Sequence, residues 1–201
     1  MATGQIVVSK SEKSYDPILT ILSSSESLLI FARCLLEVRQ NNTNTQANIQ
    51  HKIPIMIPRG NSTELLCCDP DSLLSDLANN NRPNSISIDL ISNFDSSNLA
   101  SGIKAPDISF IRKSIIQGAF IQFFELNKPN INLKSWPNNW KFAWVIRNAF
   151  AHGGKIKWTD KRIQKVQWDN FSYERKKDNG KEIIFKGFAE ADIILLLIQL
   201  K

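Results

Sequence analysis

The chain lacks long apolar runs and any recognisable export signal. Its longest apolar run, residues 193–198, is far shorter than the roughly 18 to 20 residues of a membrane-spanning helix. Residues 1–5 contain no basic segment that leads into an apolar core, so no signal peptide is visible. We therefore expect a soluble, cytoplasmic protein that does not use a membrane as a partner.

Cysteine and histidine are also scarce. The three cysteines, Cys34, Cys67 and Cys68, are odd in number and two of them are adjacent, which does not indicate a disulfide framework. No Cys-x-x-Cys or His-x-x-x-His spacing occurs, although structural zinc sites use such spacings. We expect the cysteines to behave as small hydrophobic residues, and we predict no metal site and no other cofactor.

The composition is sufficient for a hydrophobic core. Of the 201 residues, 42% are hydrophobic, including five Trp and eleven Phe, which excludes wholesale disorder. The length is typical of one domain, and we predict a single domain over residues 1–201. Low-complexity, Asn-rich segments at residues 40–46 and 79–84 are typical of loops. We therefore interpret about 40–100 as an irregular insertion within that domain.

Apolar periodicity predicts a mainly α-helical fold. Helical spacing of apolar residues is found over about 16–39, 107–126, 138–152 and 189–200. Two strand-like runs, 164–173 and 182–185, flank Asn179-Gly180, a dipeptide typical of hairpin turns. Within the insertion, residues 53–57 are consistent with a short strand and 69–77 with a short helix. The sum is a bundle of four to five helices with a small β-hairpin before the last helix.

Charge is distributed unevenly along the chain. Residues 1–100 contain seven Lys/Arg and ten Asp/Glu, a balance of −3, whereas residues 134–186 contain thirteen Lys/Arg and five Asp/Glu, a balance of +8. A concentrated basic surface attracts polyanions. The alternative is a solvated basic face without a partner.

The feature that is most informative about function is the end of the third predicted helix, residues 144–154. Arg147, Asn148 and His152 fall within an arc of roughly 140° on a helix of 3.6 residues per turn, just before Gly153-Gly154 ends it. A histidine beside an arginine supplies an acid/base group and an anion clamp, which together suit cleavage of a phosphodiester without metal. The alternative is that His152 bonds backbone carbonyls at the helix end while Arg147 forms a surface ion pair.

The segment Arg147-Asn148-Ala149-Phe150-Ala151-His152 resembles the HEPN superfamily (higher eukaryotes and prokaryotes nucleotide-binding domains). The signature of that superfamily is Arg, usually followed by a polar residue, with four to six residues in total between the Arg and the His, and this segment fits the four-residue version. The resemblance covers about residues 105–200, with the first helix completing a HEPN-like bundle. Many members are metal-independent endoribonucleases, often toxins or anti-phage effectors of toxin–antitoxin systems, and form homodimers with one shared cleft.

This resemblance implies specific roles. His152 would be the general acid/base, Arg147 would clamp the scissile phosphate, and Asn148 would orient His152 or the phosphate. The expected products are 2′,3′-cyclic phosphate and 5′-hydroxyl ends, and an antitoxin protein would be a further partner. Basic side chains after the motif would hold the rest of the RNA: Lys155, Lys157, Lys161, Arg162, Lys165, Lys176 and Lys177. The alternative is a non-catalytic HEPN-like module that binds RNA, a nucleotide or a protein.

The five tryptophans leave two interpretations open. Trp136, Trp140 and Trp144 are spaced by four residues, which favours anchors of the core or of a dimer interface. Trp158 and Trp168 lie among lysines, where they are consistent either with core packing or with stacking on single-stranded RNA. His51, the other histidine, is expected in an exposed loop.

Overall fold

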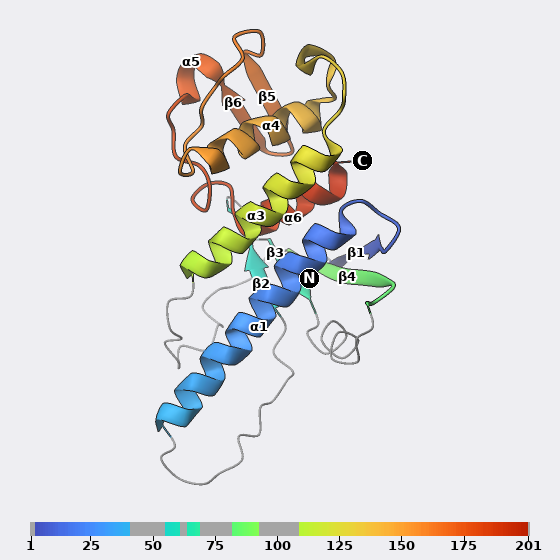
Figure 1. Cartoon of the computed structure of the whole chain (residues 1–201), viewed down its shortest axis with the longest axis vertical. Helices are drawn as coiled ribbons and strands as arrows, with labels where there is room; N and C mark the ends of the chain where they lie inside the picture. The colour runs from blue at the N-terminus through green and yellow to red at the C-terminus, as the bar shows by residue number, and fades with distance from the viewer. Residues whose placement is uncertain (1–2, 41–54, 61–63, 69–81, 93–108, 201) are drawn as a thin grey trace. The chain divides into compact units, whose positions relative to one another are not determined.

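The computed structural model describes residues 3–40, 55–60, 64–68, 82–92 and 109–200 (Figure 1). The chain divides into two compact units, one formed by Met1–Ile57 and Thr63–Ile116 and the other by Pro58–Ser62 and Gln117–Lys201. A single domain with an insertion at 40–100 stays a prediction.

The first unit contains a four-stranded sheet. Its strands are β1 (Thr3–Ser9), β2 (Ile55–Pro58), β3 (Leu65–Cys68) and β4 (Ser85–Ile91), in the order β1-β4-β3-β2. Strand β4 pairs antiparallel with both β1 and β3. Along β4, buried Ile86 and Ile88 alternate with exposed Ser85, Ser87 and Asp89, because successive side chains of a strand point to opposite faces.

Helix α1 (Tyr15–Gln40) packs against β4 in the same unit. Its buried side chains include Ile18, Ile21 and Leu22, the apolar residues whose spacing predicted this helix over 16–39. At its first residue, the Tyr15 hydroxyl donates a hydrogen bond to the carbonyl oxygen of Pro83, which ties the start of α1 to the segment before β4.

The prediction of a mainly α-helical, HEPN-like bundle is wrong. About 48% of the structure is helical and 20% is in strands, so the fold is mixed α/β. The correction comes chiefly from β1 and β4, which pair along their whole lengths from Thr3↔Ile91 to Ser9↔Ser85. The alternation in 85–91 is a period-2 signal that the sequence interpretation assigned to an irregular insertion. Strand β2, by contrast, overlaps the short strand predicted at 53–57.

Helices frame the second unit. Helix α3 (Ser109–Asn127) enters this unit at Gln117, and the 3-10 turn η2 (Leu133–Ser135) leads to α4 (Asn138–Ala151). The last helix is α6 (Glu190–Gln199), which packs against α4. These three helices confirm the helices predicted at 107–126, 138–152 and 189–200 to within two residues. The N-cap of α4 is Pro137, which makes no side-chain capping hydrogen bond.

The hairpin lies before the last helix, as predicted, but its turn is elsewhere. Strands β5 (Lys165–Trp168) and β6 (Phe171–Glu174) pair antiparallel, with Trp168 opposite Phe171. The two-residue loop is therefore Asp169-Asn170, and Asp169 has φ 48°, a left-handed conformation that Asp tolerates better than most residues. The predicted turn residues, Asn179-Gly180, instead follow the short helix α5 (Arg175–Asp178).

A buried ion pair secures the start of α6. Asp192 is fully buried and accepts hydrogen bonds from Arg59 Nε at 2.8 Å, from the Gly60 amide at 3.0 Å and from the Ala189 amide at 3.0 Å. The backbones approach so closely that a Cβ added to Gly60 would lie 2.1 Å from the Gly187 carbonyl oxygen. Glycine is therefore required at position 60.

Two sequence predictions lie outside the described residues: the short helix at 69–77 and the exposed loop around His51. Over the residues that are described, no helix combines the length and apolar character needed to cross a membrane.

Candidate functional site

The candidate site lies at the C-terminal end of α4, and an aromatic core fixes that helix. Trp140 lies 6.2 Å, centroid to centroid, from Phe123 and 5.9 Å from Phe124, both on α3. On another face of α4, fully buried Phe142 contacts rings of the hairpin and of the segment before α6: Trp168, Phe171, Tyr173 and Phe188. Figure 1 shows α4 lying beside β5 and β6. The first half of α4 is therefore held from two sides.

His152 is the C-cap of α4. Its backbone N–H bonds the Ala149 carbonyl at 3.1 Å, and the Gly154 N–H bonds the same carbonyl at 2.8 Å. Gly153 and Gly154 have φ of 65° and 83°, the left-handed conformation that ends helices, so the predicted glycine stop is confirmed. The His152 side chain is exposed and forms no hydrogen bond or ion pair with any described residue. Of the alternative interpretation, a bond from the His152 side chain to backbone carbonyls is therefore not supported, whereas the surface ion pair of Arg147 is present, with Glu125.

The chain just after His152 is also held in place. The Ile183 N–H bonds the Gly154 carbonyl at 2.9 Å, and the Ile156 N–H bonds the Lys181 carbonyl at 2.9 Å. Gly180 closes the pairing by donating to the Ile156 carbonyl at 2.8 Å. The histidine thus lies between a packed helix and a hydrogen-bonded extended segment, a setting that limits movement of its backbone.

Arg147 is partly exposed and pairs with a carboxylate of α3. Its Nε and one Nη each lie 2.8 Å from Glu125 Oε1. The other oxygen, Glu125 Oε2, pairs with Lys128 Nζ. The Lys128 hydrogen bond, with a smaller contribution from Arg147, lowers the pKa of Glu125 against the opposing effect of burial, so this carboxylate stays ionised at neutral pH.

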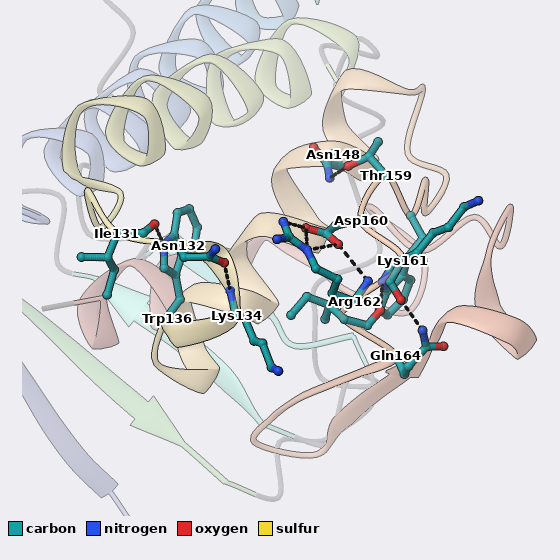
Figure 2. Close-up of polar contacts among 12 residues, drawn as sticks. Ile131, Asn132, Lys134, Trp136, Asn148, Thr159, Asp160, Lys161, Arg162 and Gln164 are labelled. Carbon is teal, nitrogen blue, oxygen red and sulfur yellow. Dashed lines mark hydrogen bonds and ion pairs between the residues drawn. The ribbon is translucent and has the colours of Figure 1, made fainter.

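The Asn148 side chain forms its hydrogen bond with Thr159 and not with His152. It is 6% exposed, and its Nδ2 lies 3.5 Å from Thr159 Oγ1, at the long limit of a hydrogen bond. Figure 2 shows this amide directed at Thr159 in the loop that precedes β5. Although i,i+4 spacing makes neighbours of two residues inside a helix, His152 has left helical geometry, with φ −123° and ψ 38°. The structure therefore gives Asn148 an anchoring contact with this loop.

The predicted RNA-binding side chains differ in their partners. Lys155 and Lys157 are exposed, because they alternate with buried Ile156 and Trp158 in an extended segment. Lys165 pairs across the hairpin with Glu174 at 3.3 Å. Four of the seven are exposed lysines that have no carboxylate partner within the described ranges: Lys157, Lys161, Lys176 and Lys177.

Arg162 is engaged within its own loop. Asp160 accepts hydrogen bonds from the Arg162 backbone N–H at 2.8 Å and from its Nε at 3.0 Å, and the guanidinium folds back onto the carboxylate (Figure 2). These bonds lower the pKa of Asp160 to about 2. Because Arg162 already has a carboxylate partner, we expect it to contribute less to phosphate binding than the lysines that have none.

The tryptophans are packing residues in this structure. Trp136, Trp140, Trp158 and Trp168 are all buried. The Trp158 indole N–H bonds the Ile163 carbonyl, and the Trp168 indole N–H bonds Gln199 Oε1 at 2.8 Å. Neither ring offers an exposed face for a nucleobase, so the stacking interpretation is not supported. Trp144 is half-buried and meets Trp158 edge to face.

Sequence reasoning missed Glu125 and Asp160. Glu125 lies 22 positions before Arg147, and only the packing of α3 on α4 brings the two together. Asp160 had a local signal, since an aspartate two residues before an arginine can accept its backbone N–H in a turn. Among the described residues, no group of three or more His, Cys, Asp and Glu side chains lies close enough to hold a metal ion.

Comparison with protein-family models, curated proteins and solved structures finds no match to this chain. The resemblance to HEPN proteins therefore rests on the Arg147–His152 motif alone.

Proposed function

We propose that this chain is a metal-independent endoribonuclease that cleaves RNA to 2′,3′-cyclic phosphate and 5′-hydroxyl ends. The observation that carries the proposal is the exposed, unbonded imidazole of His152, which follows an ordered Arg147 guanidinium by five residues at a packed helix end. This spacing, with its glycine bend, resembles that of HEPN ribonucleases. We propose their chemistry here on a mixed α/β fold, not their fold.

The reaction needs no co-reactant. The 2′-oxygen of a ribose forms a bond to the adjacent phosphorus, the bond from phosphorus to the 5′-oxygen breaks, and one proton moves from the 2′-hydroxyl to the leaving 5′-oxygen. His152 would accept or donate that proton, because a neutral imidazole has one ring nitrogen that can accept a proton and one N–H that can donate it. Arg147 would bind the non-bridging oxygens and stabilise the extra negative charge that develops on them.

A homodimer fits this chemistry. The reaction uses one base and one acid, while each copy of the described site offers one histidine, His152. Two copies that face each other across a two-fold axis would supply both groups in one cleft. The exposed lysines after the motif would hold the flanking phosphates of the RNA. Within this proposal the protein acts in the cytoplasm as a toxin or anti-phage effector, and an antitoxin protein neutralises it.

A second candidate function is RNA binding without cleavage. It is favoured by two contacts: Glu125 already occupies part of the Arg147 guanidinium, and Asn148 is bonded to Thr159 instead of His152. Under this alternative, Arg147 and the lysines bind the RNA backbone and His152 takes no part in chemistry.

The test compares wild type, His152→Ala and His51→Ala on an end-labelled structured RNA with EDTA present throughout. The two histidines are the only ones in the chain, so His51→Ala is a matched control that removes the other imidazole. We expect His152→Ala to slow cleavage by roughly 10²- to 10⁴-fold, the usual contribution of acid–base catalysis. The His51→Ala protein should cleave like wild type.

Because the His152 side chain is exposed, its removal should leave the thermal unfolding temperature unchanged, and that measurement serves as the folding control. Equal cleavage by wild type and His152→Ala would reject the proposed site. Binding of the RNA with no cleavage by any of the three proteins would favour the second candidate.

A further inference from the structure

Glu125 of α3 is the carboxylate that contacts Arg147. Glu125 uses both of its carboxylate oxygens on cations, Oε1 on Arg147 at 2.8 Å and Oε2 on Lys128. Lys128 lies three residues further along the chain and occupies the oxygen that Arg147 does not use. A carboxylate bound at both oxygens has little freedom to rotate, and the orientation it imposes on the guanidinium is correspondingly well defined.

The contact uses one edge of the guanidinium and leaves another available. A guanidinium carries five N–H groups, and the contact with Glu125 involves Nε and one Nη. The second Nη has no partner among the described residues. Bidentate recognition of a phosphate needs two parallel N–H groups, which the two Nη atoms can supply together while Nε stays on the carboxylate.

The two helices that carry this pair are firmly packed together. Phe120 of α3 lies 5.5 Å from Phe150 of α4, and Phe123 of α3 stacks at 6.2 Å on Trp140 of α4. All four aromatic rings are buried. Glu125 and Arg147 are therefore carried on two helices that buried aromatic rings pack together, while their own side chains are 36% and 33% exposed.

The charges of this group also suit one phosphate. Arg147 and Lys128 contribute two positive charges and Glu125 one negative charge, which leaves a net charge of +1 at the surface. Without Glu125 the two cations would repel each other, and a long arginine side chain would gain rotamer freedom that it must lose again on binding a phosphate.

We propose that Glu125 is a positioning residue for Arg147: it holds the Nε edge of the guanidinium so that the two Nη groups face the scissile phosphate of an RNA strand. This inference rests on the proposed nuclease function and deepens it. The opposite role is an obstructing one, in which Glu125 competes with the phosphate for Arg147 and weakens RNA binding. The two roles predict changes of opposite sign when the carboxylate is removed.

The experiment measures single-turnover cleavage at saturating protein, together with the affinity for a 2′-O-methyl version of the same RNA, which cannot react. The variants are Glu125→Ala and Glu125→Gln, and the matched controls are Glu182→Ala and Glu182→Gln. Glu182 has a similar exposure of 41% and also pairs with a lysine, Lys186 at 2.8 Å. Each control removes the same charge from a side chain that pairs with a lysine and not with Arg147.

A positioning role gives a loss in the maximal rate and little change in affinity. We expect Glu125→Ala to lower the single-turnover rate about 10-fold, because small errors in the placement of a catalytic group are costly. Glu125→Gln keeps an acceptor oxygen for Arg147 and should recover part of that loss. Affinity for the unreactive RNA should stay within about 2-fold of the matched Glu182 variant.

Other results overturn the inference. A Glu125→Ala protein that cleaves as fast as Glu182→Ala would make Glu125 an ordinary surface partner. A protein that binds the unreactive RNA more tightly and cleaves faster would make it an obstruction. If wild type cleaves RNA and His152→Ala does not, either of these two results rejects the positioning role of Glu125 and leaves the nuclease proposal standing. If wild type fails to cleave, the nuclease proposal fails, and the role of Glu125 fails with it.

Discussion

The two ends of α4 differ in their surroundings. Near its start and middle, Trp140 and Phe142 are enclosed by rings from α3 and from the hairpin. At its end, Arg147 is partly exposed and His152 is exposed to solvent. The same helix therefore serves as a core element and as the support of a surface site. The comparison indicates that stability and activity can be separated by mutation, since few side chains contribute to both.

The largest expected effect is on stability, from a substitution in the enclosed part of α4. Phe142→Ala removes a ring with no solvent exposure that contacts four other aromatic side chains. We expect a loss of roughly 3 to 5 kcal/mol in the free energy of unfolding, measured by urea denaturation. The control is Phe110→Ala, because that ring is 80% exposed and its loss should cost less than about 0.5 kcal/mol. Equal effects of the two variants would contradict the packing described here.

Asn148 sharpens the comparison, because it directly follows Arg147 near the end of α4 but is buried. Asn148→Ala removes the contact with Thr159 and should lower the free energy of unfolding by about 1 kcal/mol. The cleavage rate of the folded variant should stay within about 3-fold of wild type, in contrast to His152→Ala. A loss of activity as large as that of His152→Ala, with unchanged stability, would restore the catalytic role implied by the HEPN resemblance.

Binding measurements compare cations that have carboxylate partners with cations that do not. Lys157→Ala should weaken RNA binding and lower the slope of log K against log salt concentration by about 1, as expected for one lost phosphate contact. Lys165→Ala should have a smaller effect, because Lys165 already pairs with Glu174 at 3.3 Å. Fluorescence anisotropy across a salt series measures both. A larger effect for Lys165 would place the RNA on the hairpin instead.

The smallest expected effect is the acid response of the loop before β5. The pKa of Asp160 is lowered to about 2 in the folded protein from an ordinary value of 3.8. Its stabilising contribution is therefore complete above about pH 4 and is lost as the pH falls toward 2. Asp160→Asn should reduce the dependence of unfolding free energy on pH within this window. An unchanged pH profile would show that the Asp160–Arg162 pair adds nothing to stability.

Sequence periodicity predicted the helices well because their apolar residues follow the 3.6-residue repeat. Ile18, Ile21 and Leu22 of α1 are buried as their spacing requires. The first sheet was missed even though Ile86 and Ile88 alternate with polar residues, because the Asn-rich segments nearby suggested an irregular insertion. The hairpin turn was misplaced for a related reason: Asn179-Gly180 is the stronger local signal, but the pairing of Trp168 with Phe171 decides the turn.

The candidate site was predictable only where its determinants are local. The end of α4 and the accessibility of His152 follow from Gly153 and Gly154, both adjacent in sequence. The partner of Arg147 depends on the packing of two helices, and the burial of Asn148 depends on a loop that returns to α4. Neither contact leaves a signal in the spacing of residues near the motif.

The most direct test of the central claim is the chemistry of the product ends. Wild-type protein is incubated with a labelled RNA in EDTA, and the fragments are treated with a phosphatase before and after acid opening of cyclic phosphates. The account predicts fragments with 2′,3′-cyclic phosphate and 5′-hydroxyl ends that are not formed by His152→Ala. Fragments with 3′-hydroxyl and 5′-phosphate ends, or cleavage that EDTA abolishes, would contradict it.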